Sequence, residues 1–172
     1  NLNLDEVERA FTARTRLLIC NHSSNLLGSI LPVRELSELA HRHDARILLD
    51  IAQSAGHIPV QLESWKIDMA AFPGHKGLLG PQGTGGLYIT PDLDLMPWLY
   101  GGTGSQSEEA NQPSVRPDRY EPGTPNTSGI AGLAAGVQYV LDQGIETIAA
   151  HEQRLVMRLL EGLAEVDGVD VL

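Results

Sequence analysis

The sequence predicts an α/β fold with a mostly parallel sheet flanked by helices, and three observations support this prediction. Short apolar runs of strand length recur along the chain, at residues 15–20, 47–49 and 69–72. A helical pattern lies between the first two runs, as in a βαβ unit with a right-handed crossover. With 172 residues, 42% of them hydrophobic, the chain is also long enough to bury one sizeable core.

The first part of the chain is predicted to alternate helices and strands. Residues 2–11 carry apolar side chains at helical spacing, and Asn3 is placed to cap this helix. Residues 15–20 have the pattern of a buried strand. Residues 32–43 begin with a proline at a first helical turn and form the crossover helix. His41, near the end of that helix, has no carboxylate partner that the sequence can place, so we expect it at the surface.

The second part of the chain contains longer connections. Residues 69–72 and 86–89 are predicted strands, and beyond them Trp98 and Tyr100 are expected to pack. Residues 101–122 are polar and aperiodic, and a loop of that length in a compact domain is usually functional or disordered. Two long helical patterns and the start of a further strand follow, at residues 128–144, 145–166 and 168–172.

The composition argues against several classes of function. A net charge of −10 and a pI of about 4.9 disfavour nucleic acid or an anionic membrane as the main partner, since both need clustered Lys and Arg. No apolar run approaches the length of a membrane span and no secretory leader is recognisable, so a cytoplasmic location is expected. The single cysteine, Cys20, cannot form an internal disulfide, and in an apolar strand its thiol is expected to be inert. A small, soluble substrate fits this composition.

A glycine-rich stretch holds a lysine directly after a predicted strand. Lys76 lies in the sequence Gly74-His75-Lys76-Gly77, and it is one of two lysines in the chain. A lysine that is held in place and partly shielded from water loses its proton more easily and can attack a carbonyl to form a Schiff base. By position alone, Lys76 is equally well explained as the cap of a surface loop.

A carboxylate upstream favours the chemical interpretation of Lys76. Asp50 ends the apolar run 47–49, and Gln53 follows it at a turn. In an open parallel sheet the carboxyl ends of the strands share one crevice, so Asp50 and Lys76 would face that crevice together. A carboxylate for a pyridinium nitrogen and a lysine for a Schiff base are what a pyridoxal phosphate (PLP) site requires. The sequence therefore predicts PLP as the cofactor and no metal site.

Two motifs in this region are long and rigidly spaced. The first is Asp-x-Ala-Gln from Asp50 to Gln53, and the second is Gly-His-Lys-Gly-x-x-Gly-Pro-Gln-Gly-x-Gly-Gly-Leu-Tyr over residues 74–88. They resemble the class V aminotransferases, and most of all the cysteine desulfurase-like branch. The resemblance implies the central part of the large PLP-binding domain of an aspartate-aminotransferase-like fold. Residues 1–166 would belong to that large domain, and residues 167–172 would begin the small C-terminal domain.

The resemblance also implies a role for each matching residue. Lys76 would carry PLP as a Schiff base and later move the proton at the α-carbon of the substrate. Asp50 would keep the pyridine nitrogen protonated. Asn25 and Gln53 would hydrogen-bond the phenolic oxygen, and His75 would address the phosphate.

Two further segments gain a meaning from the resemblance. The polar residues 21–25 are by themselves either a plain turn or a set of ligand donors, and the resemblance favours donors. Thr124 matches a threonine that reaches the PLP phosphate of a neighbouring subunit, which implies a homodimer. Pro73 departs from the family pattern, because it replaces a serine whose hydroxyl commonly meets the phosphate.

The implied activity is Schiff-base chemistry on an amino acid, specifically conversion of L-cysteine to L-alanine plus enzyme-bound sulfur, with a sulfur-acceptor protein as a further partner. Two alternatives stay open. One is another class V aminotransferase or lyase, and the other is a non-catalytic fragment that kept the fold. No part of this sequence matches the family's substrate-binding arginine or its sulfur-accepting cysteine.

Overall fold

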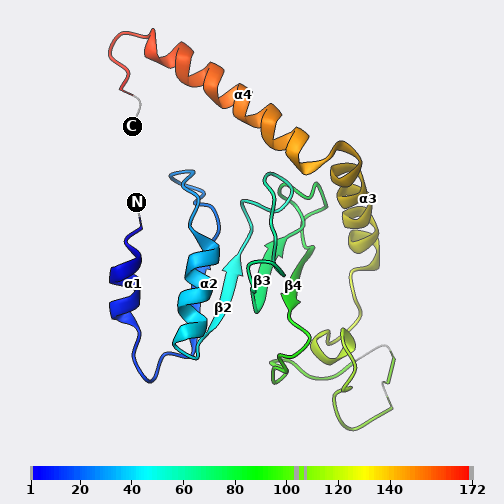
Figure 1. The fold of residues 1–172 in the computed structure, drawn as a ribbon. Helices are drawn as coiled ribbons and strands as arrows, with labels where there is room; N and C mark the ends of the chain where they lie inside the picture. The colour runs from blue at the N-terminus through cyan, green and yellow to red at the C-terminus, as the bar shows by residue number, and fades with distance from the viewer. Residues whose placement is uncertain (1, 103–104, 107, 171–172) are drawn as a thin grey trace.

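The computed structural model describes residues 2–102, 105–106 and 108–170, and at its centre lies a four-stranded sheet (Figure 1). The strands follow one another in chain order across the sheet: β1 (Leu17–Asn21), β2 (Arg46–Asp50), β3 (Met69–Pro73) and β4 (Gly85–Ile89). The first three are parallel, and β4 runs antiparallel to β3. The prediction of an α/β fold with a mostly parallel sheet is confirmed.

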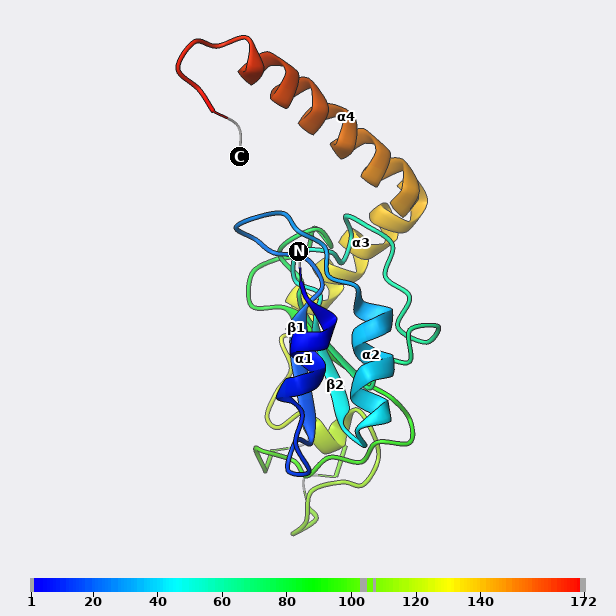
Figure 2. The ribbon, with the colours of Figure 1, turned by 60° about the vertical axis from the view of Figure 1, so that its left-hand side comes forward.

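One face of the sheet carries the hydrophobic core. Ile47, Leu49 and Ala70 have 0% exposure on this face, beneath α2 (Val33–Arg42). The short α1 (Leu4–Ala10) lies on the same side of the sheet as α2 (Figure 2). The Asn3 side chain accepts hydrogen bonds from the first N–H groups of α1, as its sequence position predicts.

The opposite face of the sheet is open. Leu17 and Ile19 in β1 are 40% and 64% exposed, and Leu87 in β4 is 53% exposed. Only alternate side chains of β1, such as Cys20, pack toward the core. The prediction that residues 15–20 form a buried strand is therefore wrong for half of its side chains, because Leu17 and Ile19 lie on the face of the described sheet that is left open.

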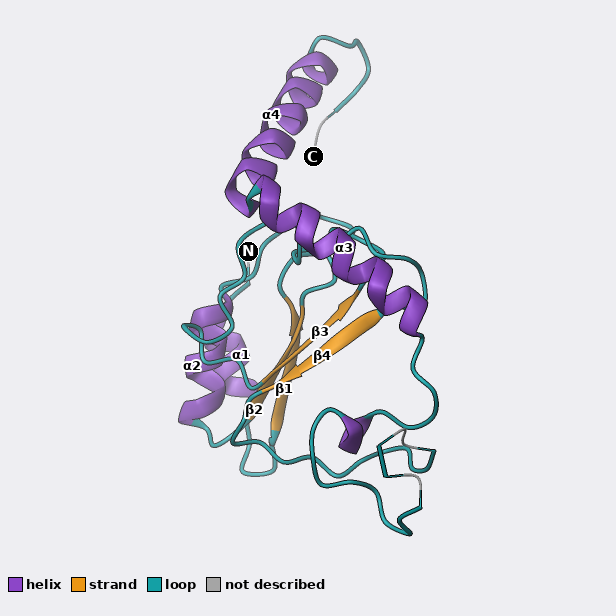
Figure 3. Ribbon diagram, turned by 90° about the vertical axis from the view of Figure 1, so that its right-hand side faces the viewer, coloured by secondary structure: helices purple, strands orange, loops and turns teal. Residues whose placement is uncertain are grey.

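Two long helices follow the strands. The helix α3 (Thr127–Gln143) crosses the end of the sheet at which β3 terminates, and α4 (Ile145–Ala164) extends away from the sheet (Figure 3). Both begin and end within two residues of their predicted bounds. They meet at Gly144, whose φ of 80° and ψ of 128° end α3 and start α4 at one residue. Among the described residues, no helix is both long and apolar enough to cross a membrane.

The connection between β4 and α3 corrects one prediction, and the segment after α4 corrects another. Trp98 and Tyr100 were expected to pack, but they are 92% and 63% exposed. Within the described part of residues 101–122 the regular structure is one short 3-10 helix, η1 (Asp118–Tyr120). The strand expected at residues 168–172 is not formed at 168–170, and residues 171–172 lie outside the described residues.

At the amino end of the sheet, one buried carboxylate joins three segments. Asp68, 3% exposed, precedes β3 and accepts hydrogen bonds from the Ile47 N–H at 2.9 Å, the Arg46 guanidinium at 2.7 Å and His41 Nε2 at 2.8 Å. Burial by itself raises the pKa of Asp68, but these hydrogen bonds outweigh it and hold the pKa below its usual value. The prediction that His41 is a surface residue is wrong, since its side chain is 32% exposed and bound to Asp68.

Candidate functional site

The lysine loop, defined here as residues 74–80, follows β3 and is closed by its own backbone. The Gly74 N–H donates to the Thr84 carbonyl at 2.7 Å, and the Gly80 N–H donates to the Gly74 carbonyl at 2.8 Å. Within the loop the Leu79 N–H donates to the Lys76 carbonyl at 2.9 Å. Lys76 is half-buried and His75 is exposed. The lysine is thus carried by a hydrogen-bonded turn and is only partly open to solvent.

Neighbouring segments approach the lysine loop more closely than side chains would allow. A Cβ added to Gly56 would lie 2.2 Å from the Gly77 carbonyl oxygen, and one added to Gly77 would lie 2.6 Å from the His57 ring. From the other side, a Cβ on Gly136 of α3 would lie 2.4 Å from the Leu78 carbonyl oxygen. The loop is therefore fixed between the turn that follows β2 and the helix α3.

Asp50 is the last residue of β2 and lies at the same end of the sheet as the lysine loop, because β2 and β3 are parallel neighbours. Its side chain is exposed, and Oδ1 accepts a hydrogen bond from the Ala52 N–H at 2.8 Å. No other described residue donates to this carboxylate. It is oriented by the backbone, and one oxygen is available to a ligand.

Asn25 and Gln53 come together in an open cleft of about 560 Å³. Ser24 shapes the turn around Asn25, since its Oγ accepts from the N–H groups of Leu26 and Leu27. Residues 21–25 thus lead into a turn that places an amide at the cleft. The cleft is also lined by His57, Glu152 and apolar residues, but not by Asp50, His75 or Lys76.

Thr124 lies apart from these residues. It is exposed, two positions before Asn126, whose side chain caps α3 by accepting from the Gly129 N–H at 3.0 Å. The described contacts bring it to none of the other predicted site residues. A role of Thr124 in the site of a second copy stays a prediction.

Burial raises the pKa of Cys20 to about 11, so the thiol stays protonated at neutral pH, as expected for an inert side chain. In the part of the chain that the structure describes, no three His, Cys, Asp or Glu side chains gather in a way that could hold a metal ion.

Sequence reasoning missed one arrangement at this end of the sheet. The Nδ1 of His57 lies 2.8 Å from Glu152 Oε1 of α4. The contact of His57 with the lysine loop was not foreseen. Glu152 lies so far along the chain from His57 that no local sequence pattern joins the two residues.

Comparison with known proteins agrees with this geometry. A family model described as aminotransferase class-V matches residues 1–172. The chain belongs to this family. A cysteine desulfurase of Escherichia coli O157:H7 is 42% identical over 171 residues, which cover 96% of this chain and 42% of that protein. A probable cysteine desulfurase 2 of Mycobacterium leprae is 39% identical and matches 100% of this chain and 40% of its own length.

Solved structures show the same fold. The apo cysteine desulfurase of Thermococcus onnurineus NA1 has a TM-score of 0.83 and 38% identity. The cysteine desulfurase CsdA of Escherichia coli, described as an S-sulfonic acid form, has a TM-score of 0.88 and 30% identity. Each match covers 96% of this chain and 42% of the other. The chain thus spans less than half the length of these relatives.

Proposed function

We propose that this chain is part of a PLP-dependent enzyme of the cysteine desulfurase type, which converts L-cysteine to L-alanine and passes the sulfur to an acceptor protein. The observation that carries the proposal is the placement of Asp50 and the lysine loop at the carboxyl ends of two adjacent parallel strands. The class V family is PLP-dependent, and relatives named cysteine desulfurase favour that branch.

The residues present fit PLP by their chemistry. The open oxygen of Asp50 suits a protonated pyridine nitrogen, and the neighbouring Ala52 offers no bulk that would obstruct a flat ring. Asn25 and Gln53 supply amide donors for a phenolic oxygen. Lys76 supplies the primary amine. When bound, PLP provides an electron sink that weakens the bonds at the α-carbon of an amino acid.

Each residue of this chain then has a defined task. Lys76 binds the aldehyde of the cofactor and moves the proton at the substrate α-carbon, while Asp50 holds the proton on the pyridine nitrogen. Asn25 and Gln53 orient the ring through its phenolic oxygen. His75 contacts the phosphate, at a site where Pro73 provides no hydroxyl.

Cys20 does not accept the sulfur, because it is packed in the core with a raised pKa. We place residues 1–166 in the large domain and 167–172 at the start of a small domain, in a cytoplasmic homodimer. Thr124 of one copy would reach the phosphate in the other.

The test uses borohydride reduction of the intact protein that contains this chain, after incubation with PLP. We expect PLP to be fixed on Lys76, as located by peptide mass spectrometry. Lys76→Ala should lose both the label and the release of alanine from cysteine, with an unchanged circular dichroism spectrum.

Lys66, the other lysine in the chain, gives the matched control, since Lys66→Ala should keep both label and turnover. A colourless protein, or equal labelling of Lys66, would refute the proposal. Labelling of Lys76 with turnover of a different amino acid would correct the substrate.

A further inference from the structure

The imidazole of His57 is one of the side chains that contact the lysine loop, and it does so at Gly77. The His57 ring lies against Gly77, so closely that a Cβ on Gly77 would be 2.6 Å from Cδ2 and 2.7 Å from Nε2. Gly77 is the residue next to Lys76. A shift of the imidazole would therefore change the space available to the backbone that carries the lysine.

The same imidazole is fixed from α4. Its Nδ1 lies 2.8 Å from Glu152 Oε1, a distance typical of a charge-assisted hydrogen bond. Because a carboxylate accepts, Nδ1 is the donor, which fixes the orientation of the ring. The side chains of His57 and Glu152 are 37% and 43% exposed, so solvent weakens the pair without removing it.

The backbone of His57 is fixed to the turn that carries Gln53. The His57 N–H donates to the Ser54 carbonyl at 3.0 Å, and Ser54 is fully buried. The preceding Gly56 has a φ of 86° and lies directly under the Gly77 carbonyl. His57 thus contacts three segments: the Gln53 turn, the lysine loop and α4.

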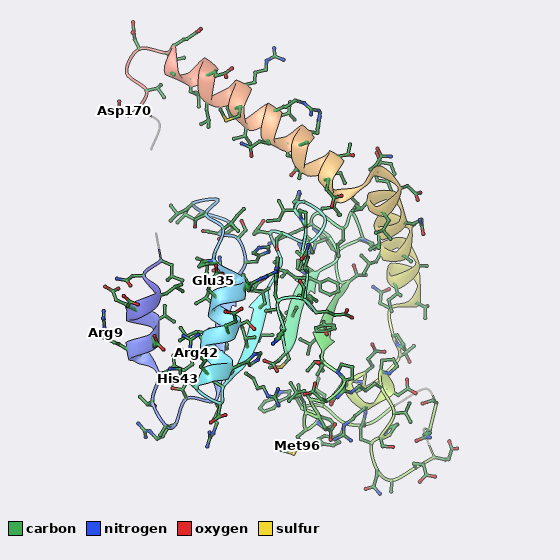
Figure 4. The ribbon with its side chains drawn as sticks, in the orientation of Figure 1. Arg9, Glu35, Arg42, His43, Met96 and Asp170 are labelled. Atoms are coloured by element: carbon green, nitrogen blue, oxygen red, sulfur yellow. The ribbon has the colours of Figure 1, made fainter. Side chains whose placement is uncertain are left out.

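A second histidine–glutamate pair, His43–Glu8, serves as a comparison for His57–Glu152, because it does not contact the lysine loop. His43 Nε2 lies 3.4 Å from Glu8 Oε1, and their side chains are 37% and 46% exposed. Figure 4 shows His43 beside Arg42 at the end of α2, near α1 and remote from the lysine loop. The two pairs share residue types and exposure but differ in what the imidazole touches.

We infer that His57 is a positioning residue for Lys76: oriented by Glu152, its ring fixes the lysine loop against the turn that carries Gln53. This inference rests on the proposed function for its catalytic meaning, whereas the contact it describes is independent of any cofactor. The imidazole transfers no proton and binds no substrate in this role.

Hydrogen exchange of the intact protein without PLP tests the contact. In His57→Ala, exchange of the amides in residues 74–80 should rise about tenfold, and in Glu152→Ala about threefold, since a half-exposed pair contributes modestly. Exchange in β2 should not change. Glu152→Gln keeps an acceptor and should restore most of the protection, while His43→Ala should leave residues 74–80 unaffected.

A second measurement tests whether the contact positions Lys76. It follows the rate at which added PLP forms a Schiff base with Lys76, trapped by borohydride. This rate should fall in His57→Ala and Glu152→Ala in the same order as the loss of protection, and kcat should fall with little change in KM. Unchanged exchange in Glu152→Ala, or an equal rise in His43→Ala, would overturn the inference. If exchange in residues 74–80 becomes faster while the rate at which PLP is fixed on Lys76 does not change, His57 packs against the loop without positioning the lysine, and the inference fails. If the unmodified protein takes no PLP, the proposed function fails and the exchange data alone decide the contact.

Discussion

The two ends of the sheet carry aspartates in opposite states. At the amino end, Asp68 is buried and accepts hydrogen bonds from a backbone N–H, a guanidinium and an imidazole. At the carboxyl end, Asp50 is exposed and accepts one hydrogen bond from the backbone nearby. Asp50 ends the central strand β2 and Asp68 directly precedes the central strand β3. Both carboxylate oxygens of Asp68 accept hydrogen bonds from the protein, whereas one oxygen of Asp50 is open to a ligand.

The difference separates a carboxylate that is bound within the fold from one that can bind a ligand. A buried charge is tolerated when each of its oxygens is paired, and Asp68 meets that condition. An oriented carboxylate with a free oxygen can instead pair with a cation from outside, such as a pyridinium nitrogen. Substitutions at the two ends should therefore affect different quantities.

The largest expected effect is that of Asp50→Asn on turnover. The amide keeps the size of the side chain but cannot hold a proton on the pyridine nitrogen, so kcat should fall about 10³-fold. The free energy of unfolding should change by less than about 0.5 kcal/mol, because the side chain is exposed. Steady-state kinetics and urea titration measure the two quantities, and a normal kcat would remove Asp50 from the site.

The next largest effect is that of Asp68→Asn on stability. The amide cannot accept from all three donors, so the free energy of unfolding should drop by about 2–3 kcal/mol. Below the melting temperature, PLP should still become fixed on Lys76. A loss under about 0.5 kcal/mol in urea would show that the cluster contributes little.

The Asp68 cluster marks the limit of what the sequence could predict. Apolar periodicity predicted every helix and strand of the described sheet region, and the Asp50 and Lys76 motifs could be placed at its carboxyl end without a structure. The Asp68 cluster could not be, since Arg46 and Asp68 meet only through the pairing of β2 with β3, and His41 joins them only through the packing of α2. The exposure of Ile19 and Trp98 was missed for a related reason, because hydrophobicity indicates that a side chain favours burial but not which segment covers it.

Low pH should remove the contribution of Asp68 to the free energy of unfolding, which sharpens the contrast between Asp68 and Asp50. The folded-state pKa of Asp68 lies below the unfolded value of 3.8. Its contribution to stability is therefore complete above about pH 4 and is lost as the pH falls through the folded-state pKa. Unfolding curves recorded at falling pH should show a smaller decline for Asp68→Asn than for the unmodified protein, and parallel declines would contradict this account.

The smallest expected effect is that of Arg46→Gln. The Arg46 side chain is 47% exposed, so its ion pair with Asp68 should stabilise the fold by less than about 1 kcal/mol. Asp68 would keep its bonds to His41 and Ile47 in this variant. Urea titration of single and double variants would give the coupling between Arg46 and Asp68, and a coupling well above this value would place Arg46 on a par with the buried donors.

The single-residue corner at Gly144 makes one position in the chain decisive for a distant contact. Glu152 lies eight residues along α4 from this corner, or about 12 Å at the rise of an α-helix. A change of about 10° in the angle between α3 and α4 would displace Glu152 by about 2 Å, on the same helical geometry. That displacement is enough to break its hydrogen bond to His57. The backbone conformation at Gly144 disfavours any side chain. A substitution there would thus change the angle between α3 and α4 and, through Glu152 and His57, alter a contact of the lysine loop that lies far from Gly144 in the chain.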